Sequence, residues 1–155
     1  MKKIIIVLSA VVLSIAAFAS EPAARFIVTK DGKFDCKQIS FGMQNARIVM
    51  TNGKKSTIPI ENINSYTVDG KQYDRLELNK KGKDASSEVF MELMKTRDDL
   101  SLYRLSHVDY ESEPALQKVD NYYVYQNGKL YLELSNKSLP SVLQFFDVKY
   151  AIASL

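Results

Sequence analysis

The sequence predicts a mainly β protein: an antiparallel, hairpin-rich sheet arranged as a small barrel or roll plus a β-meander, with one C-terminal helix. Four glycines lie in Asp-Gly or Asn-Gly pairs, at positions 31–32, 52–53, 69–70 and 127–128. Asn and Asp tolerate the positive φ that two-residue hairpin turns require, and glycine adopts it freely. Segments rich in β-branched, aromatic and apolar residues flank these pairs, so each pair predicts a hairpin turn.

The first residues predict an exported protein. Lys2 and Lys3 precede an apolar stretch, residues 4–18, and the small residues Ala17 and Ala19 lie at its end. A positive leader, an apolar middle and an A-x-A-like exit are typical of a secretory signal peptide, so residues 1–19 are expected to be removed after Ala19. The apolar stretch is shorter than the roughly 20 residues that span a bilayer as a helix. An uncleaved membrane anchor is the alternative.

Residues 20–155 are expected to form a single β-rich domain, with two sub-halves, 25–78 and 86–155, as an option that stays open. The 136 residues left of 155 after cleavage suit one domain with a real core. Without Lys2 and Lys3, 19 basic residues face 18 acidic ones, which gives a net charge of +1. This balance, without a concentrated basic stripe, argues against nucleic-acid binding.

Strands in the first half are predicted at residues 25–29, 33–39, 46–51, 54–60, 64–68 and 71–78. Pro59 has no N–H to donate, so its strand should lie at a sheet edge or end there. After the strand at 33–39 come, in order, a polar kink at Phe41-Gly42, a hairpin, and the segment 58–63, which precedes the next strand. This order resembles small SH3-like or Sm-like barrels, in which a short turn of helix precedes the closing strand.

Strands in the second half are predicted at residues 88–95, 100–108, 121–126 and 129–135. Residues 88–94 in the first of these are apolar on both faces apart from Glu88 and Glu92, which suits a central strand covered on two sides. The polar segments 79–87 and 109–120 are expected to be surface loops, and the former is the best candidate for a boundary between halves.

The C-terminal residues change to a helical period. Asn136 or Ser138 can cap a helix, and Pro140 fits its first turn, where a missing N–H costs nothing. Spacings of three and four residues then give one apolar stripe of Leu139, Val142, Leu143, Phe146 and Tyr150. We expect this helix to lie across the sheet and cover one face.

The last hairpin carries the candidate binding residues. A two-residue turn at Asn127-Gly128 would direct three pairs to the core: Tyr125 with Leu130, Tyr123 with Leu132, and Asn121 with Leu134. Tyr122, Val124 and Tyr131 would then lie on the other face, beside Lys129 and Glu133. Such an amphipathic surface suits recognition of a protein or a sugar. The alternative is a second core layer beneath the C-terminal helix.

Single reactive residues give little support for catalysis. Cys36 is the one cysteine, so no internal disulfide forms, and a small buried side chain is favoured over a reactive thiol. His107 is the one histidine, and Ser106 would point to the opposite face of its strand. One His and one Cys leave a zinc site short of ligands, so we expect no metal and no other cofactor.

Paired carboxylates are the remaining catalytic candidates. Asp98 and Asp99 adjoin in a predicted turn, and Glu111 and Glu113 lie in a predicted loop. A glycosidase needs two carboxyl groups across a cleft, one of them with a raised pKa. Turn and loop chemistry explains these acids without catalysis.

The tyrosine-rich hairpin before a C-terminal helix is similar to small exported bacterial proteins of unknown function, through residues 102–104, 122–125 and 139–146. This resemblance implies no activity. We expect a non-enzymatic binding or envelope-associated module in the periplasm or at the cell surface, whose partner is a protein or glycan of the envelope. A carboxylate-dependent hydrolase acting on glycan or peptide, and a subunit of a surface assembly that donates an edge strand, are the alternatives.

Overall fold

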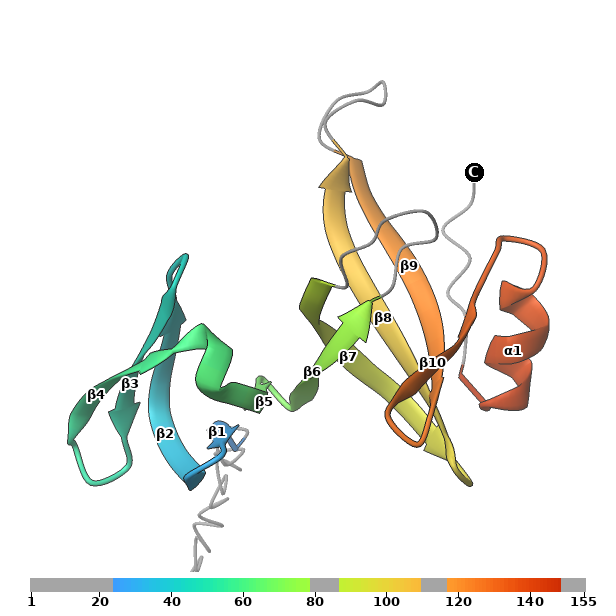
Figure 1. Cartoon of the computed structure of the whole chain (residues 1–155). Coiled ribbons are helices and arrows are strands. Elements are labelled where there is room, and N and C mark those ends of the chain that lie inside the picture. The colour runs from blue at the N-terminus through green and yellow to red at the C-terminus, as the bar shows by residue number, and fades with distance from the viewer. Residues whose placement is uncertain (1–23, 79–86, 110–116, 149–155) are drawn as a thin grey trace, which may run out of the picture.

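The computed structural model describes residues 24–78, 87–109 and 117–148. They form one antiparallel sheet of ten strands in the order β10-β9-β8-β7-β6-β5-β1-β2-β3-β4, with a single α-helix after the last strand (Figure 1). The strands are Phe26–Thr29 (β1), Gly32–Phe41 (β2), Asn45–Met50 (β3), Lys55–Pro59 (β4), Ile63–Val68 (β5), Lys71–Leu78 (β6), Ser87–Arg97 (β7), Leu100–Asp109 (β8), Gln117–Gln126 (β9) and Lys129–Glu133 (β10).

The predicted fold class is confirmed, and the sheet stays open instead of closing into a barrel. Its two edge strands, β4 and β10, each pair with one neighbour only. Strands β1 to β4 lie at one end of the molecule, and β10 and α1 (Leu139–Phe145) lie at the other (Figure 1). Pro59 ends the edge strand β4, as its missing N–H predicts. The 3₁₀-helix η1 (Ile60–Asn62) follows and supplies the expected helical turn before β5.

Three groups of buried residues form the core. The first core cluster lies between β1, β2, β3 and β5 and consists of Ile27, Cys36, Ala46, Ile48 and Ile63. The second core cluster belongs to β6 to β9 and consists of Leu78, Met91, Tyr103, Tyr123 and Tyr125. The third core cluster joins β8 and β9 to the helix and consists of Leu102, Val124, Leu139, Leu143 and Phe146.

The two halves of the sheet bury opposite faces. Strand pairing aligns Tyr66, Tyr73, Glu92, Arg104 and Tyr122 across β5 to β9, so these five residues share one face. Tyr66 packs on the first core cluster and Tyr122 on the third, whereas the second core cluster lies on the reverse face. Strand β7 is therefore central and covered on both sides, with Met91 0% and Glu92 9% exposed.

All four predicted hairpin turns are present, but they differ in geometry. Asp69 and Gly70 have φ of 52° and 75°, and Asn127 and Gly128 have φ of 48° and 76°, as two-residue turns of this kind require. At the other two pairs only Gly32 and Gly53 have positive φ. All four Asp-Gly and Asn-Gly pairs therefore mark where the chain reverses. Only two of the four adopt the backbone conformation, positive φ at both residues, that such pairs predict.

The helix is shorter than its apolar stripe suggests. Its N-cap is Ser138, and Pro140 lies in the first turn as predicted. The chain leaves the helix at Phe146, because Asp147 adopts a positive φ of 54°. The N–H of Asp147 then donates to Gln144 and that of Val148 to Leu143, the pattern of a Schellman motif. Tyr150 lies outside the described residues.

Two further expectations are corrected. The segment 109–120 is not loop throughout, because β8 continues to Asp109 and β9 begins at Gln117. In the last hairpin Leu130 faces Tyr125 as expected, but Leu132 faces Val124 and Glu133 faces Tyr123. An irregularity between Leu130 and Leu132 adds one residue, Tyr131, to β10 and shifts every later pair. The predicted partners of Tyr123 and Asn121 are thus wrong.

Candidate functional site

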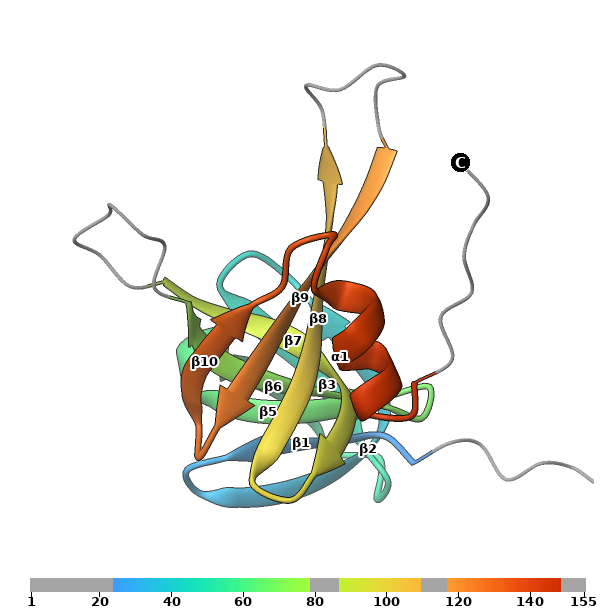
Figure 2. The ribbon, with the colours of Figure 1, turned by 90° about the vertical axis from the view of Figure 1, so that its right-hand side faces the viewer.

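The three candidate binding residues of the last hairpin do not form one exposed surface. Val124 is 3% exposed and belongs to the third core cluster, and Tyr122 packs against the same cluster. Helix α1, which contributes to this cluster, lies beside β8 and β9 (Figure 2). Tyr131 is 65% exposed, because the irregularity in β10 separates it from both. Of these three residues, only Tyr131 offers a large exposed aromatic side chain to a partner, and its binding role stays a prediction.

The other single candidates lie far apart. Cys36 is buried in the first core cluster, and its thiol donates to the carbonyl of Phe34 at 3.2 Å. Burial raises the pKa of this thiol, which suits a core side chain and not a nucleophile. His107 is exposed on β8, while Ser106 on the other face donates to Asp120 at 2.5 Å.

The candidate carboxylates are only partly described. Asp98 and Asp99 are both exposed in the short turn between β7 and β8, where Asp98 adopts a φ of 55°. Gln126 donates to Asp99 at 2.6 Å. Glu111 and Glu113 lie outside the described residues. Two adjoining acids in one exposed turn do not provide the cleft that the hydrolase hypothesis requires.

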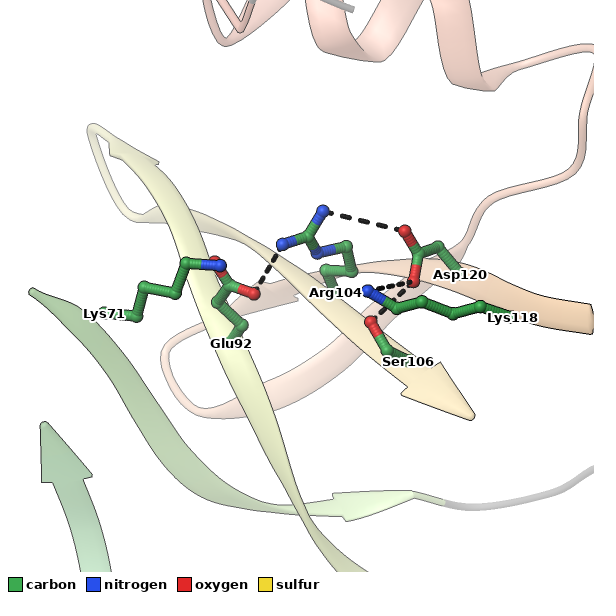
Figure 3. A network of polar contacts seen from close by, with 6 residues as sticks. All are labelled: Lys71, Glu92, Arg104, Ser106, Lys118 and Asp120. Carbon is green, nitrogen blue, oxygen red and sulfur yellow. Dashed lines mark hydrogen bonds and ion pairs between the residues drawn. The ribbon is translucent and has the colours of Figure 1, made fainter. Parts of the chain in front are cut away.

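A charged network crosses β6 to β9 on the face that α1 covers in part (Figure 3). At its centre, Arg104 donates to one carboxylate oxygen of Glu92 at 2.6 Å, and Lys71 lies 3.4 Å from the other. A second terminal nitrogen of Arg104 lies 3.6 Å from Asp120, whose carboxylate also accepts from Ser106.

This network holds the strands together instead of offering a reactive group. Both oxygens of Glu92 are engaged, and the side chains of Glu92 and Arg104 are only 11% and 19% exposed. The hydrogen bond to Glu92 raises the pKa of the Arg104 guanidinium, which therefore stays charged. A carboxylate whose lone pairs already serve two cations is a poor general base.

Aromatic side chains continue this face toward the first half. The rings of Tyr66 and Tyr73 stack at 4.8 Å, and Phe90 meets Tyr66 edge-on at 5.1 Å. Phe41 contacts Tyr66 at 4.5 Å. Burial raises the pKa of Tyr66 to about 12, so its hydroxyl stays protonated at neutral pH. These contacts show that the aromatic side chains pack the two halves of the sheet against each other.

Two hollows lie on the outer side of β2, β3 and β4, in a region that we call the β2–β4 groove. Two adjoining hollows of about 570 and 830 Å³ share Ser40, Arg47 and Thr57. The register aligns Ser40 with Arg47 and Arg47 with Thr57, so the three side chains lie in a row across the strands. Gln38, Val49 and Lys55 form the next row in the same way.

The β2–β4 groove is positively charged and ends at an exposed apolar residue. Its lining residues include Arg47 and Lys55 but no carboxylate, and neither cation forms a salt bridge with any described residue. Met43, at the turn from β2 to β3, lines the second hollow and is 100% exposed. A hydrogen bond of 2.8 Å from the N–H of Gly42 to the carbonyl of Asn45 closes this turn. The groove therefore combines charge, hydroxyl and amide groups with one apolar contact.

No motif in the sequence indicates the β2–β4 groove. Arg47 lies between the apolar Ala46 and Ile48, as on the solvent side of any half-buried strand, and Lys55 and Thr57 lie in a polar stretch. Met43 follows Gly42 in a polar segment. This setting was the one feature of the sequence that could have indicated an exposed apolar side chain.

No helix in the described part of the chain is long and apolar enough to cross a membrane. Among the same residues no group of three or more His, Cys, Asp or Glu side chains is arranged to hold a metal ion. Comparison of the chain with models of protein families, with curated proteins and with solved structures found no match.

Proposed function

We propose that the domain is an extracytoplasmic binding module without catalytic activity, and that it recognises a protein partner through the β2–β4 groove. The observation that carries the proposal is the pairing of two cations without described salt-bridge partners, Arg47 and Lys55, with the fully exposed Met43. Arg and Met are enriched in protein interfaces, where an apolar contact gives affinity and charge gives specificity.

The predicted export supports an extracytoplasmic partner. The predicted signal peptide, residues 1–19, would carry the domain out of the cytoplasm, and the partner would then be a component of the envelope. The groove lies at the opposite end of the molecule from α1 (Figure 1). A partner in the groove would therefore leave the third core cluster and the helix undisturbed.

The test is recovery of proteins from an envelope extract on the immobilised domain, with identification by mass spectrometry. We expect that Met43→Ser/Arg47→Glu abolishes recovery of at least one protein that the unmodified domain retains. Lys137→Glu makes a charge change of the same size at an exposed position before α1 and should retain that protein. Identical recovery by all three forms would contradict the proposal.

A parallel variant separates the groove from the last hairpin. Tyr131→Ala removes the one exposed residue of the original candidate set without entering the core. Loss of the partner in this variant, with retention by Met43→Ser/Arg47→Glu, would move the binding surface to β10.

A further inference from the structure

The outer edge of β4 has backbone groups that no described strand uses. Strand β4 is the last in the sheet order and pairs with β3 alone. At the two ends of this pairing, Met50 donates to Lys54 and Ile60 donates to Gln44, each at 2.9 Å. Hydrogen-bonded and non-bonded pairs alternate in an antiparallel ladder, so residues 54, 56, 58 and 60 direct their N–H and C=O groups toward β3.

The residues between them direct the same groups outward. Lys55 and Thr57 each offer an N–H and a C=O at the free edge, and Pro59 offers a C=O only. Pro59 thus occupies a position where its missing N–H breaks no bond to β3. The free edge is a short, regular row of donors and acceptors that ends at Pro59.

A hollow lies on each side of this edge. On the outer face the β2–β4 groove presents Lys55, Thr57 and Arg47. On the inner face a hollow of about 230 Å³ is lined by the apolar Phe34, Met50 and Ile58 and by polar residues that include Asp31 and Asn62, with the small Ser56 at the strand itself. Alternate residues of any strand added to β4 would enter the two hollows in turn.

We propose that the β4 edge binds an extended peptide segment of the partner protein as an additional antiparallel strand. The segment carries an apolar residue opposite Ser56, between two acidic residues opposite Lys55 and Thr57. This proposal rests on the proposed function and names the class of partner that the β2–β4 groove takes.

The side chains on β4 specify this alternation. A carboxylate opposite Lys55 forms a cross-strand ion pair, and a carboxylate opposite Thr57 can reach over that small residue to Arg47. Opposite Ser56, an apolar side chain enters the inner hollow between Met50 and Ile58. The main-chain bonds to Lys55 and Thr57 give affinity, and the two hollows give specificity, as in other cases of strand addition.

The charge of the edge favours a foreign segment over a second copy of this chain. Lys54 and Lys55 adjoin, and residues 54–59 contain no carboxylate. Pairing β4 with β4 of another molecule would place four lysines along one seam without a compensating acid from either strand, and edge lysines oppose such pairing. An acidic segment meets complementary charge at the same place.

The experiment uses a fluorescein-labelled peptide with Glu-Leu-Glu at its centre and threonines on both sides, measured by fluorescence anisotropy. Two N-methylated forms are compared with it. Methylation of both Glu amides blocks the N–H groups that would face β4, whereas methylation of the Leu amide blocks one that faces away. We expect the Leu-methylated peptide to bind like the parent, and the Glu-methylated peptide to bind at least about tenfold more weakly.

The protein variants test the charge preference in the same assay. Arg47→Glu/Lys55→Glu should weaken binding of the parent peptide, and Lys137→Glu should leave it unchanged. Equal binding of both methylated peptides would overturn strand addition and leave a groove that attracts acidic peptides. Absence of binding of the parent peptide at about 1 mM would also overturn strand addition. The proposed function is decided separately, by whether recovery of an envelope protein depends on Met43 and Arg47.

Discussion

The hydroxyl of Tyr125 on β9 donates a hydrogen bond of 2.8 Å to the backbone carbonyl of Glu77 on β6. Two strands, β8 and β7, separate these residues in the sheet order, so the bond crosses the second core cluster on the inner face of the curled second half. Tyr125 is 2% exposed and lies in the second core cluster. This contact ties β9 to β6 across the core that the open sheet encloses.

Removal of this hydroxyl should destabilise the fold without changing it. Tyr125→Phe keeps the ring and its edge-on contact with Tyr103 at 5.4 Å, but leaves the Glu77 carbonyl without this donor. We expect the free energy of unfolding to fall by about 1 to 2 kcal/mol, as measured by urea denaturation. An unchanged midpoint would show that the bond does not constrain the curl.

The same hydroxyl makes stability depend on alkaline pH. Burial raises the pKa of Tyr125 from its ordinary value of 10.0 to about 12, so the folded state retains the phenolic proton to higher pH than the unfolded chain does. This contribution is complete below about pH 10 and is lost as the pH rises toward 12. The stability difference between the original chain and Tyr125→Phe should therefore shrink over this range in paired urea titrations. A constant difference would contradict this account of burial.

The turns and the edge strand were predictable because their causes are local. Asp69-Gly70 and Asn127-Gly128 adopt positive φ at both residues, and Pro59 lies where a donor is not needed. The position of Tyr131 was not predictable, since the Asn127-Gly128 turn sets the register only at the start of β10, and the irregularity between Leu130 and Leu132 follows it. Met43 and Arg47 could not be predicted as site residues, because only the fold shows that they line one groove.

The Glu92–Arg104 pair should be one of the strongest polar contributors to stability. Glu92→Gln removes the charge that Arg104 and Lys71 both face, and leaves a largely buried guanidinium with Asp120 as its described acidic partner. The expected loss is about 3 kcal/mol in the free energy of unfolding. Lys71→Met is the matched control, because this lysine is half exposed and its loss should cost less than about 1 kcal/mol. Equal effects of the two variants would contradict the central role of Arg104.

The helix should be held by its buried apolar residues. Leu143 is 2% exposed in the third core cluster, and Leu143→Ala should cost about 2 to 4 kcal/mol. Faster amide exchange in α1 and β9 than in β2 and β3 would show that the third core cluster loosens independently of the first. Uniform acceleration along the chain would show that the halves unfold together. Gln144→Ala on the exposed side of α1 is the control.

Export has a direct chemical readout. When the full chain is expressed in a bacterium, the protein recovered outside the cytoplasm should begin at Ser20. Ala19→Asp replaces the small residue before the cleavage position and should cause the uncleaved precursor to accumulate. N-terminal sequencing that starts at Met1 in the exported protein would refute cleavage.

The central claim is that β4 keeps a free edge for a partner strand, and amide hydrogen exchange in the isolated domain tests it most directly. The N–H groups of Ser56 and Ile58 face β3 and should exchange slowly, whereas those of Lys55 and Thr57 face outward and should exchange quickly. Fast and slow exchange alternating from residue to residue is the result that this account predicts. Equal protection of all four amides would mean that the edge is already covered, and would contradict it.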